Sequence, residues 1–245
     1  MKPLADRIAL ITGASRGIGH ATALALAKAG AHVVAVARTV GGLEELDDAI
    51  KAAGGSATLV PLDLKDFDAL DRLGASLNER YGKLDVLVAN AGILGPLSPM
   101  SHVEPKAFDD VMAVNVTANY RLIRSLDPLL QKSDAARAVF LTSGAAWTPI
   151  AYWGPYSVSK AAVELMARIY AAETATTKLR VNIFNPGPIR TRMRATAMPG
   201  EDPMTLDTPE IVAEKILDLC LPSYGETGTL YNYRVEKFLT FTPPS

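Results

Sequence analysis

Short apolar runs alternate with longer amphipathic stretches along most of this chain. The runs at residues 8–11, 32–38 and 180–184 have the length of buried strands, and glycine, proline or polar residues follow each of them. Stretches such as 67–81 instead repeat apolar residues at helical spacing. Every connection between strands is long enough for a right-handed parallel crossover. The pattern therefore predicts an α/β fold: a doubly wound parallel sheet of about seven strands with helices on both faces, in three layers.

The second half of the chain continues this alternation with one interruption. A long helical pattern covers residues 104–131, a last helix begins near Thr208, and residues 228–232 predict a seventh strand at the edge of the sheet. Within about 188–208, methionine, proline and glycine are frequent and no periodicity is visible. We interpret this segment either as a mobile flap over a substrate or as an ordinary connector.

Length and charge limit the classes of protein that remain. A chain of 245 residues is large enough for one α/β domain, and we expect residues 1–245 to form a single domain. Apolar residues make up 49% and charged residues 21%, which argues against disorder and against a coiled coil. The formal net charge of −1 gives no basic field, so a nucleic-acid partner is disfavoured.

Cysteine content and the first residues indicate the compartment. Cys220 is the only cysteine, so no intrachain disulfide can form, and with three scattered histidines a Cys/His metal site is nearly excluded. The N-terminal residues lack the pattern of a signal peptide, and no apolar run approaches the length of a membrane span. We expect a cytoplasmic protein without a membrane partner or a metal.

A glycine-rich turn follows the first predicted strand. Gly13, Gly17 and Gly19 stand between that strand and an amphipathic helix. Glycines let a backbone approach phosphate groups closely, and a helix N-terminus offers unpaired N–H groups and a favourable dipole. A glycine triplet alone indicates only a tight turn, but at the first strand-to-helix turn it predicts a pyrophosphate site.

The end of the second strand indicates which dinucleotide is bound. An acidic residue there would bind the adenosine ribose of NAD, whereas a basic residue accommodates the 2′-phosphate of NADP. This chain has Arg38 and no carboxylate at that point, and Arg16 in the glycine turn adds a second cation. Two solvated arginines are the alternative. We favour NADP, with NAD as the second choice.

Polar residues follow the third and fourth strands and interrupt one helix. Asp63 can accept a hydrogen bond from the adenine amino group or cap the helix that begins near Asp66, and capping is the more general role. Residues 90–92 are small enough for a flat ligand to lie against the backbone on the adenosine side. Asn115, in the apolar middle of a helix, must either bond within the core or hold a water near the site.

Tyr156 and Lys160 lie one turn apart on one face of an amphipathic helix. The pKa of a phenol is near ~10, and a nearby ammonium lowers it toward neutrality, which suits proton exchange with an alcohol or carbonyl oxygen. Ser143 ends a buried strand upstream and can direct its hydroxyl at the same oxygen. Such a pair also occurs by chance in helices, and a serine at a strand end often only forms a turn.

Two further segments are candidates for ligand contacts. Two prolines fix the turn after residue 185, and Thr191 offers a hydroxyl toward a phosphate or a carboxamide. Tyr152, Trp153 and Met193 are candidates for an apolar pocket, although such residues near a helix start are as often part of a core or an interface.

Taken in order, these motifs resemble the short-chain dehydrogenase/reductase family over residues 7–230. The resemblance implies a Rossmann-type sheet and hydride transfer between a nicotinamide cofactor and a carbonyl compound or secondary alcohol. It further implies that Tyr156 is the general acid/base and that Ser143 polarises the substrate oxygen. Lys160 would bind the nicotinamide ribose and lower the pKa of the tyrosine, and Asn115 would hold a water that relays protons to Lys160.

The resemblance also implies a cofactor site that spans several loops. Asp63 matches an adenine contact, Arg16 and Arg38 match the 2′-phosphate contacts, and Ile189 with Thr191 match contacts to the nicotinamide side. The full set of implied cofactor residues is Gly13, Ser15, Arg16, Gly17, Ile18, Gly19, Arg38, Asp63, Leu64, Asn90, Ala91, Gly92, Tyr156, Lys160, Pro186, Gly187, Ile189 and Thr191.

Two departures from the family pattern concern the sheet and the assembly. Ala89 replaces the first of two asparagines, so a sheet-bracing hydrogen bond must come from elsewhere. Residues 232–238 replace a terminal Gly-Gly that often accompanies tetramers, so a homodimer through the helices of Asn115 and Tyr156 is favoured over a tetramer. A non-catalytic, nucleotide-binding redox sensor or assembly protein is the alternative function, although such a protein would have little reason to keep the four polar site residues together.

Overall fold

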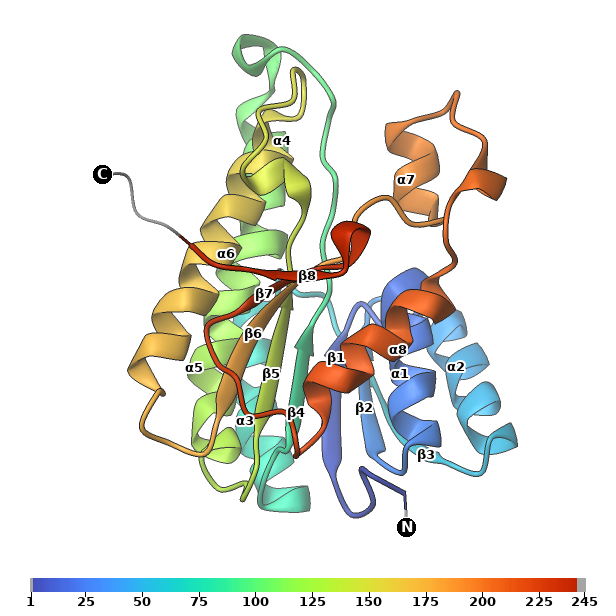
Figure 1. Cartoon of the computed structure of the whole chain (residues 1–245), viewed down its shortest axis with the longest axis vertical. Helices are drawn as coiled ribbons and strands as arrows, with labels where there is room; N and C mark the ends of the chain where they lie inside the picture. Colours follow the sequence, from blue (N-terminus) through green and yellow to red (C-terminus); the bar gives the residue numbers. More distant parts are fainter. Residues whose placement is uncertain (1, 242–245) are drawn as a thin grey trace.

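One eight-stranded sheet forms the centre of the computed structural model, which describes residues 2–241 (Figure 1). The strand order is β3-β2-β1-β4-β5-β6-β7-β8, and β1 to β7 are parallel. Met1 and residues 242–245 of the predicted single domain lie outside the described residues. The strands are β1 Ile8–Thr12, β2 His32–Ala37, β3 Ser56–Pro61, β4 Val86–Ala89, β5 Arg137–Leu141, β6 Arg180–Asn185, β7 Leu230–Asn232 and β8 Lys237–Leu239.

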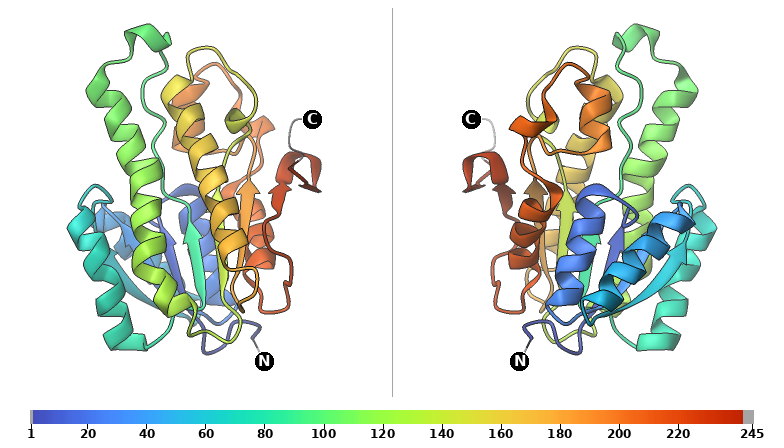
Figure 2. Two further views of the ribbon diagram at one scale, coloured as in Figure 1. Left: turned by 90° about the vertical axis from the view of Figure 1, so that its left-hand side faces the viewer. Right: turned by 90° about the vertical axis from the view of Figure 1, so that its right-hand side faces the viewer.

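Helices cover both faces of the sheet, so the predicted Rossmann-type α/β architecture is confirmed (Figure 2). One core lies between the sheet and α1, α2 and α8, and the other between the sheet and α3, α5 and α6. Because neighbouring strand residues alternate between faces, Val33 joins the first core and Val34 the second. The helices are α1 Gly17–Lys28, α2 Val40–Ala52, α3 Phe67–Tyr81, α4 Pro105–Met112, α5 Ala118–Leu130, α6 Gly154–Glu173, α7 Arg192–Ala197 and α8 Pro209–Cys220.

Helix α3 shows how local chemistry sets the ends of an element. The Asp66 carboxylate accepts a hydrogen bond from the backbone N–H of Ala69 (2.9 Å), and Gly82 ends the helix with a left-handed φ of 73°. Asp63 instead accepts from the backbone N–H of Lys65 in a local turn (3.0 Å). The expectation that Asp63 caps α3 is therefore wrong, because Asp66 takes that position.

The strand count and the edge of the sheet differ from the prediction. β8 pairs antiparallel with β7, so the sheet has eight strands and residues 228–232 do not form its edge. The turn between them contains no glycine: Glu236 supplies the left-handed conformation with a φ of 49°. A three-residue strand after such a turn leaves no period in the sequence, which is why the pattern did not predict it.

The helical pattern at residues 104–131 is continuous but not uniform. Helix α4 leads into a π-helical turn over Ala113–Thr117, which leads into α5. Among residues 2–241, no helix is long and apolar enough to cross a membrane.

Candidate functional site

The predicted site residues gather where the parallel strands end. The carboxyl ends of β1, β4, β5 and β6 share one edge of the sheet, and α7 stands above that edge (Figure 1). In an open α/β sheet, ligands bind at this edge.

The glycine turn after β1 forms a cradle that only glycine permits. Gly13 and Gly17 have φ values of 69° and 58°, in the left-handed region that favours glycine. A Cβ on Gly19 would lie 2.3 Å from the Gly13 carbonyl oxygen and 2.4 Å from Asn90 Nδ2. On the other side of the cradle, the Thr191 methyl group would lie 3.5 Å from a Cβ on Gly17. The geometry fits a pyrophosphate held at the N-terminus of α1 and bordered by Thr191.

Asn90 braces this cradle. Its Nδ2 donates to the Thr12 carbonyl oxygen (2.9 Å), while the Thr12 hydroxyl accepts from the backbone N–H groups of Asn90 and Ala91 (3.1 Å each). These bonds join the ends of β1 and β4, and they supply the bracing that Ala89 cannot. Thr12 could not be predicted as the partner, because the two residues meet only in the folded sheet.

Two cations and one carboxylate lie at the predicted adenosine side. Arg16 precedes α1 in an extended conformation and is exposed. The Arg38 guanidinium is exposed and lies 3.8 Å from the Asp63 carboxylate, so the predicted 2′-phosphate contact and the predicted adenine contact are neighbours. An exposed pair at this distance contributes about 1 kcal/mol or less to stability, which leaves Arg38 free to exchange partners.

Tyr156 and Lys160 lie together on the buried face of α6. Lys160 Nζ lies 5.8 Å from the centre of the Tyr156 ring and donates to the Leu141 carbonyl oxygen at the end of β5 (2.8 Å). Burial lowers the pKa of Lys160 to about 8. Burial also raises the pKa of Tyr156, and hydrogen bonding from Ser143 opposes that rise. The expected lowering of the tyrosine pKa is therefore wrong for the protein alone, because burial is the largest influence on it.

Ser143 forms the turn that was one of the two roles considered for it, and its role toward the substrate oxygen stays a prediction. Its Oγ accepts from the backbone N–H of Ala145 (3.3 Å) and so starts a short 3₁₀ turn, Gly144–Ala146. Hydrogen bonding with the same side chain opposes the rise in the pKa of Tyr156. The serine therefore forms a turn that aims it at the phenol.

Asn115 bonds within the core. Its side chain is fully buried in the π-helical turn, where Oδ1 accepts from the Ile93 N–H (2.8 Å) and Nδ2 donates to the Ile93 carbonyl and to Ser159 Oγ (2.9 Å each). Gly92 lies between this amide and the ammonium, because a Cβ there would be 3.3 Å from Asn115 Oδ1 and 3.5 Å from Lys160 Nζ. Asn115 thus fixes the loop after β4 beside Lys160.

An apolar cluster surrounds the phenol. Leu94, Ala145 and Ala197 pack with Tyr156, and Trp153 and Met198 pack against them. The Trp153 ring meets the Tyr156 ring edge to face at 5.9 Å. Trp153 thus packs against buried residues, as in the core alternative considered for it. Tyr152 and Met193, 60% and 37% exposed, lie outside this cluster, and Met198 was missed because it follows a short helix without periodicity.

The segment at 188–208 is tied together by its own arginines. The Arg190 guanidinium donates to the carbonyl oxygens of Pro203 (2.7 Å) and Leu206 (3.0 Å), and Arg194 forms a two-pronged ion pair with Glu201 (2.6 and 2.7 Å). These contacts connect the residues on either side of α7, and a role as a flap stays a prediction.

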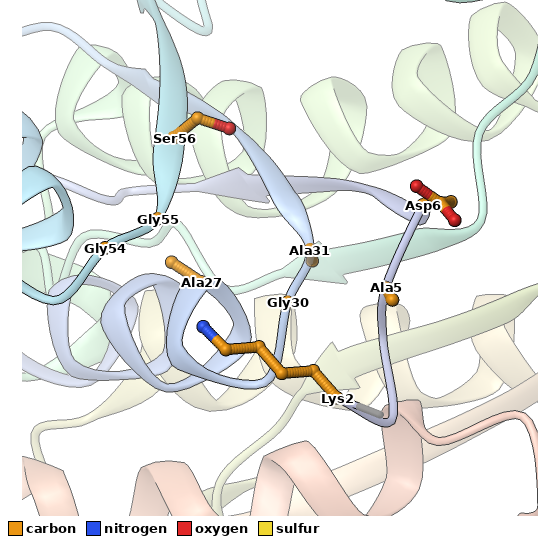
Figure 3. A pocket seen from close by; sticks show the side chains of 9 residues that line it. All are labelled: Lys2, Ala5, Asp6, Ala27, Gly30, Ala31, Gly54, Gly55 and Ser56. Atoms are coloured by element: carbon orange, nitrogen blue, oxygen red, sulfur yellow. The ribbon is translucent and has the colours of Figure 1, made fainter.

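A separate pocket lies far from this chemistry. Figure 3 shows it at the amino end of β2 and β3, where Lys2, Asp6 and Ser56 border about 350 Å³. It lies beside the C-terminal ends of α1 and α2, and its lining contains none of the predicted site residues.

The comparisons with known proteins define the class. The sequence matches the short chain dehydrogenase family over residues 7–202, and the chain belongs to this family of oxidoreductases. It is 42% identical over 209 residues to the uncharacterized oxidoreductase YciK of Escherichia coli K12, covering 84% of this chain and 82% of that one. A Shigella flexneri short chain dehydrogenase solved with NADP superposes with a TM-score of 0.91 at 38% identity, covering 95% of this chain and 99% of that one. An E. coli CFT073 short chain dehydrogenase solved with NADPH gives 0.89 at 38%, with coverages of 95% and 98%.

Proposed function

We propose that this protein is an NADP(H)-dependent oxidoreductase that interconverts a small carbonyl compound and the corresponding alcohol. One observation carries the proposal: Tyr156, Lys160 and Ser143 meet at the end of β5, beside a glycine cradle bordered by Thr191. The solved relatives that hold NADP or NADPH support the choice of cofactor. So does the exposed Arg38 at the end of β2.

The residues then divide the chemistry between them. NADPH, when bound, supplies the hydride. The Ser143 hydroxyl holds the substrate oxygen, and the Tyr156 hydroxyl gives it a proton as it gains negative charge. The ammonium of Lys160 stabilises the phenolate that remains, which compensates for the burial that raises the pKa of Tyr156. In the reverse direction Tyr156 takes the proton back.

The apolar cluster around Tyr156 favours a carbonyl group with an apolar substituent. Trp153, Leu94 and Met198 exclude water from one side of the phenol. A dry site strengthens the hydrogen bonds to the substrate oxygen.

Replacing Tyr156 with phenylalanine tests the proposal. We expect Tyr156→Phe to lower kcat by about 100-fold or more, because general acid catalysis is lost while the ring stays in place. NADPH oxidation would be measured against a panel of ketones, aldehydes and 3-oxoacyl thioesters, with cofactor binding followed by fluorescence. Retained turnover in the variant would refute the assigned role, and tight cofactor binding without wild-type turnover would favour a redox sensor.

We also propose a homodimer formed through α5 and α6. Val158, Leu165 and Ile169 form an apolar stripe along α6 and are 41%, 53% and 50% exposed, and Tyr120 on α5 is 49% exposed. An uncovered apolar face of two helices is typical of a protein–protein interface.

A further inference from the structure

The C-terminal hairpin lies beside the nicotinamide side of the site. Its turn, residues 232–236, joins β7 to β8 and contains the 3₁₀ turn Tyr233–Val235. Figure 1 shows this turn, in red, beside the orange segment that leads to α7. Phe238 on β8 packs against Tyr231 and Tyr224, with ring centres 5.0 and 6.1 Å apart, so the hairpin is anchored to the body of the protein.

The start of the turn contacts the first part of the segment 185–191. Asn185 Nδ2 donates to Asn232 Oδ1 (3.3 Å), while Asn185 Oδ1 accepts from the backbone N–H of Gly187 (3.1 Å). Gly187 has a left-handed φ of 68°, and its missing Cβ would lie 3.4 Å from the Cβ of Arg234. The hairpin turn is therefore packed directly against the turn at Gly187.

The next residue of the hairpin is connected to the other end of the same segment through Asp207. The Tyr233 hydroxyl donates to the Asp207 carboxylate (2.9 Å). The Asp207 carbonyl oxygen in turn accepts from the backbone N–H of Arg190 (2.9 Å), and Asp207 forms an isolated bridge with Ile189. Thr191 follows immediately and borders the glycine cradle at Gly17. Two bonds thus connect Tyr233 to the backbone that positions Thr191.

We propose that the hairpin turn 232–236 is a buttress for the segment 185–191, and that Tyr233 is a positioning residue for cofactor binding. Asn232 holds the segment before Gly187, and Tyr233 holds it through Asp207 before Thr191. A segment fixed at both ends presents Thr191 to the cradle without an ordering cost on binding. This inference rests on the proposed function for its cofactor, but the buttress itself is a property of the protein alone.

Trypsin gives a readout that needs no substrate. Arg192 and Arg194 lie in α7, which directly follows the segment 185–191 and precedes Asp207, and cleavage there requires local opening. Tyr233→Phe removes only the hydroxyl. We expect cleavage in the cofactor-free variant to be about fivefold faster, in line with the loss of one hydrogen bond to a carboxylate. We expect the Kd for NADPH to rise by about the same factor, with kcat changed by less than about twofold.

Tyr224→Phe is the matched control, because its hydroxyl bonds to Thr229 in the same region (3.2 Å) and has no bond to the segment. Asp207→Asn keeps an oxygen acceptor and should be cleaved at nearly the wild-type rate. Asp207→Ala should be cleaved as fast as Tyr233→Phe, and the double variant no faster than either.

If Tyr233→Phe behaves like Tyr224→Phe, the buttress is overturned. Faster cleavage with an unchanged Kd would overturn the positioning role. A wild-type protein that binds no NADPH would defeat the proposed function, while the cleavage rates would still decide the buttress.

Discussion

The buried ammonium of Lys160 destabilises the folded protein at neutral pH. The residue is 5% exposed, and its pKa is lowered from 10.5 to about 8 by burial. This difference corresponds to about 3 kcal/mol against the folded state wherever both states are protonated. The cost is therefore fully present below pH 8 and disappears as the pH rises toward 10.5. A residue kept at such a cost is typical of a functional site rather than of a core.

Replacing Lys160 with methionine should lower the activity and raise the stability of the protein. We expect Lys160→Met to lose most turnover and to raise the free energy of unfolding at pH 7 by about 1–2 kcal/mol. The rise is smaller than the full cost of burying the ammonium, because the Leu141 carbonyl loses its hydrogen-bond donor. Urea unfolding at pH 7 and at about pH 10 measures the free energy of unfolding of both proteins. The stability gained by the variant should vanish at the higher pH, because the wild-type lysine is then neutral in the folded state. A variant less stable than the wild type at pH 7 would show that the ammonium is better compensated than its burial indicates.

Arg38 is the residue proposed to select NADP(H) over NAD(H). Arg38→Ala should raise the Kd for NADPH by about tenfold or more and leave that for NADH within about twofold, because only NADPH offers the 2′-phosphate. Fluorescence titration with both cofactors measures this, and Arg72→Ala on the exposed surface of α3 is the control. An equal rise in Kd for both cofactors would show that Arg38 contacts the part of the adenosine that both share.

The sequence predicted the placement of the candidate side chains better than it predicted their surroundings. Helical spacing placed Tyr156 and Lys160 on one face, and the structure has them there. The partners of Asn115 and the shift of the tyrosine pKa depend on the packing of α6 against distant segments. Such contacts have no sequence period, so only the alternatives could be stated in advance.

At the scale of elements, the glycine cradle depends on close contact between α1 and β4. We expect Gly19→Ala to lower the free energy of unfolding by about 1–3 kcal/mol and to abolish most NADPH binding, because the new methyl group would meet the Gly13 backbone and Asn90. Chemical denaturation and cofactor titration measure the two effects. Gly41→Ala, in the first turn of α2 with no atom within 4 Å of the added Cβ, should instead gain about 0.5–1 kcal/mol. Equal effects of the two would show that the cradle tolerates a side chain.

Elements with strong periods were predicted well, and short ones were not. Helix α3 occupies residues 67–81 as the pattern indicated, since four buried leucine and glycine positions repeat along one face. Strand β8 and the π-helical turn at Asn115 are each five residues or fewer. At that length, tertiary contacts rather than sequence period decide the conformation.

At the scale of the whole molecule, topology explains why residues far apart in the chain form one site. Parallel strands joined by right-handed crossovers place all their carboxyl ends at one edge, so loops after β1, β4, β5 and β6 must meet. The alternation of strands and helices was enough to predict this meeting. It could not predict that the C-terminal hairpin would reach the same edge, because β8 reverses direction after a turn without glycine.

The apolar stripe on α6 makes the assembly testable. A homodimer that buries this face would remove Leu165 from water, and its burial contributes about 1.5–3 kcal/mol, or roughly ten- to a hundredfold in Kd. Leu165→Glu adds a charge that cannot be buried without a partner, so we expect the variant to be monomeric at micromolar concentration. Light scattering after size exclusion measures the mass.

Val40→Glu on α2, which is 50% exposed outside the stripe, should leave the dimer intact. Since Leu165 shares α6 with Tyr156 and Lys160, a monomer that keeps full activity would show that the helix holds the site without the partner. An unchanged mass in Leu165→Glu would contradict the proposed interface.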